Sequence, residues 1–280
     1  MERGDVAGPV FEHLVAGRFA DYFNSVRTTR GVPWLFVHVA KTAGTSLRQD
    51  INRVLRPATH ITVRGPNLGR NRDDMFDDAV EAFLQRHAAT PYRLASGHLR
   101  ARHTEKLRAA LPGLRCCTMV RDPLARLVSD YRYQRSALNP VGSFFARQNP
   151  DFRAYFSRPH AHNVIAKSLV PLALIKAGDA AAAARYILDR FAFVGVQERY
   201  ALSVRTLTAA MGRPIEPTAE AYRTPDSAET RVVVSADDAA LLRRLNAFDI
   251  ALVEVFAQQW EVIAVGLEDY LQVTVTAASG

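Results

Sequence analysis

The sequence predicts an α/β protein in three layers, with a central parallel sheet covered by helices on both faces. Short β-favouring runs alternate with amphipathic segments along most of the 280 residues, a pattern typical of parallel sheets. A hydrophobic content of 48% and a charged content of 23% indicate a globular protein with a sizeable core. No repeat or low-complexity segment interrupts the pattern.

The expected elements follow one another in a regular order. We expect strands at 34–39, 92–96, 115–120 and 192–197. Helical patterns occur at about 45–55, 73–88, 104–111, 123–136, 180–190, 199–212 and 236–261. The stretches 56–72 and 137–150 are predicted to be loops, long enough to act as lids over a site. Residues 1–33 are expected to be an N-terminal helical extension, helical over 9–26, followed by a single domain over 34–280.

Composition excludes several classes of protein. No run of 18 apolar residues occurs, and the N-terminus carries acidic residues without a continuous apolar stretch. We therefore expect a cytoplasmic protein with no membrane span and no signal peptide. Cys116 and Cys117 are adjacent in a strand pattern, so their side chains should point to opposite faces. This arrangement favours core packing over a disulfide or a metal site.

The positive charge is concentrated in one region. The net charge is +8, carried by 32 Arg and 4 Lys. Residues 93–135 hold nine Arg and one Lys against three acidic residues, which is +7 in one stretch. Such a concentrated field suits an anionic ligand. Nucleic acid is not the expected partner, because no helix-turn-helix pattern or aromatic-interleaved basic stripe accompanies the charge.

The first candidate site segment is AlaLysThrAlaGlyThrSer at 40–46, between the first strand and the first helix of the domain. A loop of this kind leaves helix N–H groups unpaired and forms an anion site. It is not a Walker A loop, because Lys41 precedes Gly44 instead of following the second glycine. The alternative is an ordinary turn with a solvated lysine.

Two further segments follow other strands. Arg121 stands at a strand end, before a helix start marked by Asp122 as N-cap and Pro123 at the first position. Arg126 and Ser129 share a face of that helix, and an arginine with a hydroxyl suits a phosphate, although a surface Arg–Asp network is the alternative. His98 follows Gly97 at the end of another strand, where it is either a general base or a structural histidine.

Together these segments resemble the PAPS-dependent carbohydrate sulfotransferases, where PAPS is 3′-phosphoadenosine 5′-phosphosulfate. Residues 36–46 are similar to the family's 5′-phosphosulfate loop, FxHVxKTxGTS, and residues 121–131 to its 3′-phosphate motif, RDPxxRxxSxY. The Gly97–His98 pair resembles the base-bearing segment of the heparan sulfate 2-O-sulfotransferase branch. Residues 193–207 and 241–256 resemble later segments of the same family. The likeness thus spans roughly 34–260 in the expected order.

The resemblance implies a P-loop NTPase-like sulfotransferase fold and transfer of a sulfuryl group from PAPS to a hydroxyl of a sugar, a glycan or another acceptor. It implies that His98 is the general base and that Lys41 stabilises the leaving group. It implies no metal, because the sulfuryl group carries less charge than a phosphoryl group. The implied donor-binding residues are Lys41, Thr42, Ala43, Gly44, Thr45, Ser46, Arg121 and Ser129.

The chain departs from the family in two respects. Ala40 stands where proline is common, and no membrane anchor precedes the domain, which suggests a bacterial-type cytoplasmic enzyme. Arg100 and Arg223 are candidate acceptor-binding residues, Arg223 because AlaTyrArgThrProAsp loosely resembles an acceptor-binding segment. His38 should be buried beside the donor.

Several assignments stay open at this stage. Glu198 is expected either to orient Lys41 or a ribose, or to cap the next helix. His160 and His162 are expected in a surface loop, with a metal pair as the weaker alternative. The acceptor and the oligomeric state also stay open, with the N-terminal segment a candidate contact surface for a homo-oligomer.

Two other functions compete with sulfuryl transfer. A nucleotide kinase or ATPase would share the fold, but the GxxxxGK[ST] pattern and a Mg²⁺-binding carboxylate at a strand end are missing from the sequence. A non-catalytic module that binds polyanions through the basic stretch is the third hypothesis.

Overall fold

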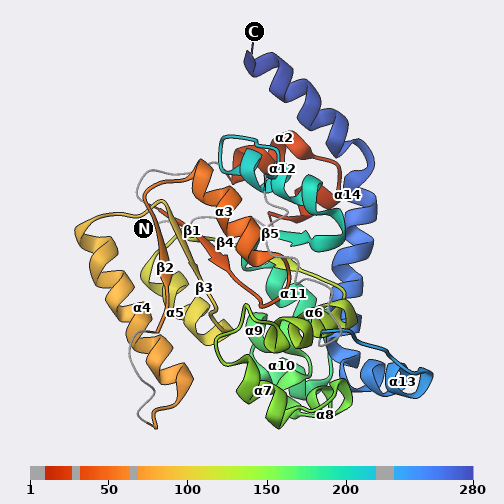
Figure 1. Cartoon of the computed structure of the whole chain (residues 1–280). Helices are drawn as coiled ribbons and strands as arrows, with labels where there is room; N and C mark the ends of the chain where they lie inside the picture. The colour runs from red at the N-terminus through yellow and green to blue at the C-terminus, as the bar shows by residue number, and fades with distance from the viewer. Residues whose placement is uncertain (1–9, 27–31, 64–68, 219–229, 280) are drawn as a thin grey trace.

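The computed structural model describes residues 10–26, 32–63, 69–218 and 230–279. Within these residues five strands form one sheet in the order β2-β3-β1-β4-β5, and every neighbouring pair is parallel (Figure 1). The strands are β1 (Trp34–Val37), β2 (Ala58–Ile61), β3 (Leu94–Gly97), β4 (Arg115–Val120) and β5 (Phe191–Val196). The predicted α/β class with a parallel sheet is confirmed.

The edge strand β2 lies in a segment for which the sequence predicts a loop. The prediction of a loop over 56–72 is therefore wrong for Ala58–Ile61, which pairs with β3 in the register Ile61↔Gly97. β-branched Thr59 and Ile61 favour a strand here, but the surrounding Pro, Gly and Arg residues obscured the signal. As part of β2, His60 lies on the sheet.

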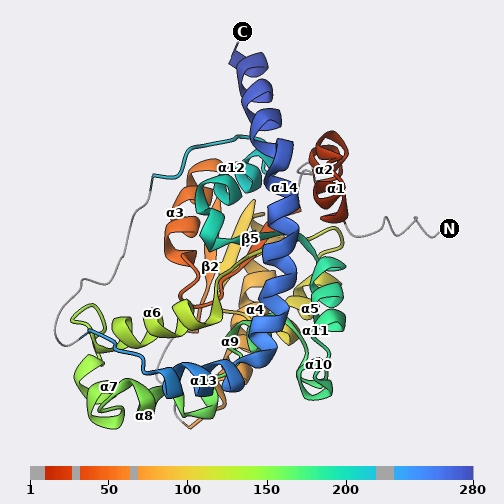
Figure 2. The same cartoon turned by 90° about the vertical axis from the view of Figure 1, so that its right-hand side faces the viewer.

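Helices cover both faces of the sheet. Figure 2 shows α3 (Gly44–Val54) and α12 (Tyr200–Ala210) on one side of the sheet, and α5 (Ala101–Ala110) and α11 (Ala180–Leu188) on the other. The long helix α14 (Ala247–Ser279) runs in front of the sheet in this view and packs on β5, α11 and α12. The helix α4 (Arg72–Ala89) packs against β2 and α5. This arrangement places the sheet in the middle layer of three, as the alternation of patterns predicts.

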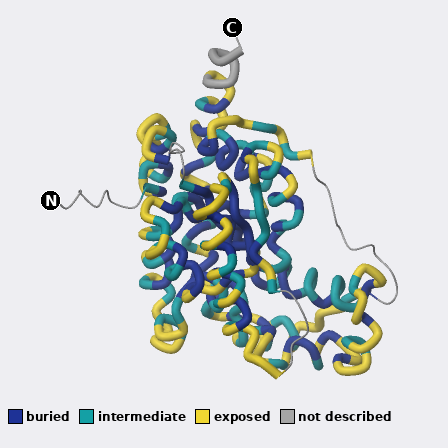
Figure 3. Tube along the Cα trace, turned by 90° about the vertical axis from the view of Figure 1, so that its left-hand side faces the viewer, coloured by how far each residue is buried: buried dark blue, intermediate teal, exposed yellow. Residues whose placement is uncertain are grey.

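The core is centred on the sheet, where Figure 3 shows the buried residues gathered. Trp34 and Phe36 of β1 and Cys116 and Cys117 of β4 are fully buried. Both cysteines are free thiols, as their adjacency predicts. Trp260 of α14 is also fully buried and donates from Nε1 to the Val194 carbonyl at 2.8 Å, which fixes this helix on β5.

A second, smaller cluster lies at the end of the molecule where β4 delivers the chain into α6 (Pro123–Arg135). It includes buried residues of α6, α8 (Phe152–Phe156) and α13 (Ala236–Leu245), and α7 (Gly142–Gln148) packs beside them (Figure 2). The predicted loop 137–150 is therefore wrong over α7. Three short helices that the sequence did not indicate follow: η1 (Pro159–Ala161), α9 (Val164–Leu169) and α10 (Leu172–Ala177).

The C-terminal region differs from the single helix predicted over 236–261. The helical conformation is interrupted at Asn246, which separates α13 from the longer α14. A kink at Val265 and Gly266 interrupts α14 itself. Beyond that break Leu267 is buried in the main core and Tyr270 stacks on Phe23 of the N-terminal segment, with ring centroids 5.7 Å apart. Only the C-terminal end of α14 projects from the molecule (Figures 1 and 2). By length and composition Ala247–Val273 would reach across a membrane, yet one such helix is weak evidence, since core helices pass the same test. Its buried face, which includes Phe256 and Trp260, packs in the main core.

The N-terminal segment forms two helices instead of one. These are α1 (Glu12–Val15) and α2 (Phe19–Ser25), separated at Gly17, whose φ is +70°. Phe11, Leu14 and Tyr22 are buried in the same core as the sheet, and the Tyr22 hydroxyl donates to the Ala192 carbonyl at 3.0 Å. The division of the chain at residue 33 stays a prediction.

A last short helix, η2 (Gln197–Arg199), follows β5.

Candidate functional site

The loop between β1 and α3 has an unusual backbone. Lys41 has φ +66° and Ala43 has φ +61°, a left-handed conformation that costs a residue with a Cβ about 1 kcal/mol. The Thr42 hydroxyl donates to the Val39 carbonyl at 2.9 Å and holds the turn. Ala43 is the N-cap of α3, so no side chain caps the first N–H groups of the helix. An uncapped helix start of this kind is the arrangement that the sequence predicts, and it suits an anion.

Gly44 fits where no larger residue would. A Cβ on Gly44 would lie 2.0 Å from Cδ2 and 2.1 Å from Nε2 of His38. The His38 ring therefore rests directly on the backbone at the start of α3. His38 is 8% exposed and stacks on Phe36 with ring centroids 5.4 Å apart, which confirms its predicted burial.

His98 is held in one orientation by its neighbours. Its Nδ1 lies 2.8 Å from the His38 carbonyl oxygen, and because a carbonyl only accepts, Nδ1 carries the proton. The other nitrogen, Nε2, is then free to accept a proton. The ring stacks on His38 at 4.0 Å, and the residue keeps solvent exposure. Desolvation lowers the pKa of His98, the His38 hydrogen bond opposes this, and Arg72 and Arg48 lower it further. A neutral imidazole at neutral pH suits a general base.

His60 is a third histidine at this strand edge, and sequence reasoning missed it because of the predicted loop. Its Nδ1 lies 2.9 Å from Ser96 Oγ, and its ring meets that of His98 edge-on at 6.3 Å. Burial lowers the pKa of His60, with Arg48 and His98 adding to the effect. Burial also lowers the pKa of His38 to about 2. In the described part of the chain no group of three or more His, Cys, Asp or Glu is placed to hold a metal.

Arg121 stands at the end of β4 beside the loop, as predicted. Its Nη1 donates to the Lys41 carbonyl at 3.3 Å, whereas its buried Nε has no hydrogen-bond partner among the described residues. Desolvation lowers the pKa of Arg121, and Glu198 and Asp122 oppose that shift. Glu198 accepts the Asp122 N–H at 2.8 Å and so fixes the turn after β4. No described side chain caps α12, so the predicted helix cap is wrong, and a role of Glu198 in orienting Lys41 or a ribose stays a prediction.

The start of α6 follows the sequence prediction in detail. The Asp122 carboxylate accepts the Ala125 N–H at 2.7 Å, and Pro123 is the first helical residue. Ser129 is half-buried, whereas Arg126 is only 1% exposed and donates to Asp130 at 3.3 Å. Nη2 of Arg126 is buried without a hydrogen-bond partner among the described residues. Arg126 therefore belongs to the interior below α6.

Lys41 directs its ammonium toward α6. Nζ lies 4.1 Å from the centroid of the Tyr133 ring. Desolvation lowers the pKa of Lys41, Asp130 opposes the shift, and Arg121 and Arg126 add to it. Tyr133 was not singled out by the sequence, although it lies four residues after Ser129 on the same helix face.

The remaining predicted site residues lie elsewhere. Arg100 is exposed and pairs with Asp73 of α4 at 3.0 Å, and Arg223 lies outside the described residues. His162 lies 2.7 Å from the Phe156 carbonyl through Nε2, whereas His160 sits edge-on to Tyr155 at 6.2 Å. The two histidines thus hold the segment around η1 instead of converging on one point.

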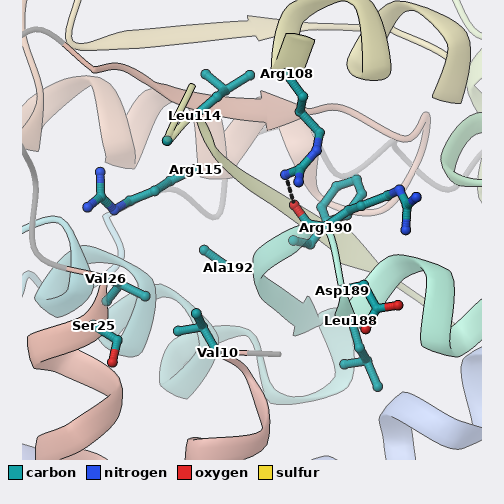
Figure 4. A pocket seen from close by; sticks show the side chains of 12 residues that line it. Val10, Ser25, Val26, Arg108, Leu114, Arg115, Leu188, Asp189, Arg190 and Ala192 are labelled. Carbon is teal, nitrogen blue, oxygen red and sulfur yellow. Dashed lines mark hydrogen bonds between the residues drawn. The ribbon is translucent and has the colours of Figure 1, made fainter. Parts of the chain in front are cut away.

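A pocket of about 310 Å³ lies at the opposite end of the sheet (Figure 4). It is lined by the end of α2 and by the first residues of β4 and β5, among them Val26, Arg115 and Phe191. At its wall Arg108 donates to the Arg190 carbonyl at 2.8 Å. Because Lys41, His98 and Arg121 are at the carboxyl ends of the strands, this pocket is separate from the site.

Comparisons with known proteins give a faint likeness. No protein-family model matches this chain, and no curated protein matches it. A sulfotransferase from Alicyclobacillus acidocaldarius aligns with a TM-score of 0.47 and 18% identity over 82% of this chain and 96% of that one. The structure of mouse sulfotransferase SULT7A1, complexed with PAP, aligns with a TM-score of 0.35 and 15% identity over 84% of this chain and 67% of that one. Because both TM-scores lie below 0.5, neither alignment establishes a family, a reaction or a ligand for this chain.

Proposed function

We propose that this chain is a PAPS-dependent O-sulfotransferase, acting in the cytoplasm on a hydroxyl of a sugar, a glycan or another small acceptor. One observation carries the proposal: four features lie together at the strand ends. They are a strained loop that leads into an uncapped helix, the lysine of that loop, a buried arginine nitrogen without a hydrogen-bond partner among the described residues, and a histidine with a free Nε2. The first three features suit a donor that carries two anionic groups. The fourth suits removal of a proton from a hydroxyl.

The donor would supply the sulfuryl group and leave as adenosine 3′,5′-bisphosphate. In this proposal the N–H groups of Gly44, Thr45 and Ser46 hold the 5′-phosphate, and Arg121 holds the 3′-phosphate together with Ser129. The unpaired Nε of Arg121 fits this role, because a buried donor without an acceptor is costly until an anion arrives. Lys41 stabilises the negative charge that builds on the leaving oxygen.

His98 would act on the other side of the transferred group. Its Nδ1–H is committed to the His38 carbonyl, so Nε2 takes the proton from the acceptor hydroxyl as oxygen attacks sulfur. The proton ends on His98, the sulfuryl group on the acceptor oxygen, and the electron pair on the bisphosphate. Loss of one charge-stabilising contact in such a site typically costs about 10²–10³ in rate.

Thermal unfolding with adenosine 3′,5′-bisphosphate, ATP and AMP tests the donor site first. A ligand at 100 times its dissociation constant adds about 2.7 kcal/mol and raises the melting temperature by several degrees. We expect this rise with the bisphosphate in the wild type and a much smaller one in Arg121→Met. An equal rise with ATP, or none with the bisphosphate, would contradict the proposal.

Transfer from labelled PAPS to a panel of sugars and phenols then tests the reaction. Lys41→Ala and His98→Ala should each lower the rate of transfer by a factor of at least about 10². Their far-ultraviolet circular dichroism spectra and melting temperatures should stay near those of the wild type. His162→Ala serves as the matched histidine control, because its ring nitrogen Nε2 bonds with the Phe156 carbonyl and the residue has no part in the proposed reaction. Wild-type turnover in His98→Ala would refute the base assignment.

A further inference from the structure

Lys41 is held by an aromatic ring, a contact that no motif in the sequence indicates. Its ammonium lies 4.1 Å from the Tyr133 centroid, within the range of a favourable cation–π interaction. Both residues are half-buried, so the contact is screened less than one on the open surface. The Tyr133 hydroxyl has no hydrogen bond in the part of the chain described here, so the ring is the part of this side chain that makes the contact.

The nearby carboxylate does not neutralise Lys41. Asp130 acts on the Lys41 charge, but its oxygens are engaged by other groups. Oδ2 accepts from the Tyr155 hydroxyl at 2.8 Å and from Arg126 at 3.3 Å, and Oδ1 accepts from Gln134 at 3.5 Å. Among the described residues Lys41 forms no ion pair with any carboxylate. The fold thus leaves the one lysine of the loop without a carboxylate partner among the described residues.

A ring and a carboxylate would prepare Lys41 in different ways. A carboxylate would neutralise the ammonium and compete with an incoming anion for the same N–H donors. The face of an aromatic ring attracts the cation through its quadrupole and occupies one side only, which leaves N–H groups free for oxygen. The contact also favours the protonated amine and so opposes the desolvation that lowers the pKa of Lys41.

We propose that Tyr133 is the positioning residue for Lys41: its ring holds the ammonium over the loop, unpaired and oriented for the oxygen of the leaving group. The inference rests on the proposed function for its consequence in catalysis, whereas the contact itself is testable without any donor. The ring acts through Lys41, so loss of the ring matters only while Lys41 is present.

Lysine NMR tests the contact directly, because the chain has only four lysines. In protein labelled with ¹³C at lysine Cε, the Lys41 signal is identified by its loss in Lys41→Arg. Ring current from Tyr133 should displace this signal from those of the other three lysines. The displacement should persist in Tyr133→Phe and vanish in Tyr133→Leu. An unchanged signal in a folded Tyr133→Leu would overturn the proposal.

Kinetic measurements test the effect of Tyr133 on catalysis. Tyr133→Leu should lower kcat about tenfold, with little change in the donor KM, and move the alkaline limb of the rate profile to lower pH. Tyr133→Phe, which keeps the ring, should retain most of kcat and the alkaline limb of the wild type. Tyr186→Leu is the matched control, because it removes a ring 3.9 Å from the Arg190 guanidinium on the far side of the molecule and should leave both unchanged. Equal losses in Tyr133→Leu and Tyr133→Phe would refute a role for the ring.

A double-mutant cycle separates the two hypotheses. The rate of sulfuryl transfer is measured in the wild type, Tyr133→Leu, Lys41→Met and the double variant. Tyr133→Leu should add nothing in the Lys41→Met background, and an undiminished effect there would overturn the positioning role. If the wild type binds no bisphosphate, the proposed function fails, and the lysine signal alone decides whether Tyr133 holds Lys41.

Discussion

Replacement of Gly44 by alanine tests the packing at the centre of the site. The new Cβ would lie 2.0 Å from the His38 ring, whereas ordinary contact begins at 3.4 Å, so the ring would have to retreat by about 1.4 Å. His38 is confined between Phe36 and His98, whose rings lie 5.4 Å and 4.0 Å away. Overpacking of this kind costs about 1–3 kcal/mol, and each kcal/mol lowers the melting temperature by about 2–4 °C in a chain of this size.

The assay is urea unfolding of Gly44→Ala, His38→Ala and the double variant. In the His38→Ala background the clash is absent, and alanine should be neutral or up to about 1 kcal/mol stabilising, because it favours a helix more than glycine does. The penalty of the substitution should therefore disappear or change sign. An equally destabilising Gly44→Ala in both backgrounds would refute the account, since the penalty would then come from the backbone and not from the ring.

Three further predictions concern His98, Asp249 and Arg121. Because desolvation lowers the pKa of His98, the acid limb of kcat/KM should lie below pH 6.5 in the transfer assay; a limb above 6.5 would contradict this. Burial raises the pKa of Asp249 from 3.8 to about 6, so the folded state keeps a proton that the unfolded chain has lost. The free energy of unfolding should therefore fall by roughly 3 kcal/mol as pH rises from about 4 to 6. Urea unfolding should show this slope in the wild type and its loss in Asp249→Asn. Arg121→Lys should weaken bisphosphate binding about tenfold more than AMP binding in calorimetry, because a lysine lacks the second donor of the guanidinium; equal losses would remove Arg121 from the 3′-phosphate subsite.

Much of the fold was predictable from local pattern. The strands β1, β3, β4 and β5 lie within two residues of their predicted starts, because each is a short apolar run followed by a helix pattern. The start of α6 was also predictable, since an Asp cap and a Pro at the first position carry their own signal. β2 was missed because its four residues lie among turn-forming ones, and α7 because its pattern is too short.

The site was predictable only in part. The strand-end positions of His98 and Arg121, and of Lys41 in the loop after β1, could be predicted because parallel strands bring their carboxyl ends to one edge; their roles stay predictions. Glu198 was placed near the site, but its partner, the Asp122 N–H, depends on how β4 and β5 pair. His60 was missed together with its strand.

The sequence by itself determined the class of fold and the chemistry available at the strand ends, because both depend on residues close together along the chain. Only the tertiary structure decided which of those groups meet. His98 bonds to the His38 carbonyl because β1 and β3 are neighbours in register, and Lys41 lies over Tyr133 because α6 leaves β4 beside the loop. Such contacts join residues 60 and 92 positions apart, and they depend on strand order and register, which no local periodicity encodes.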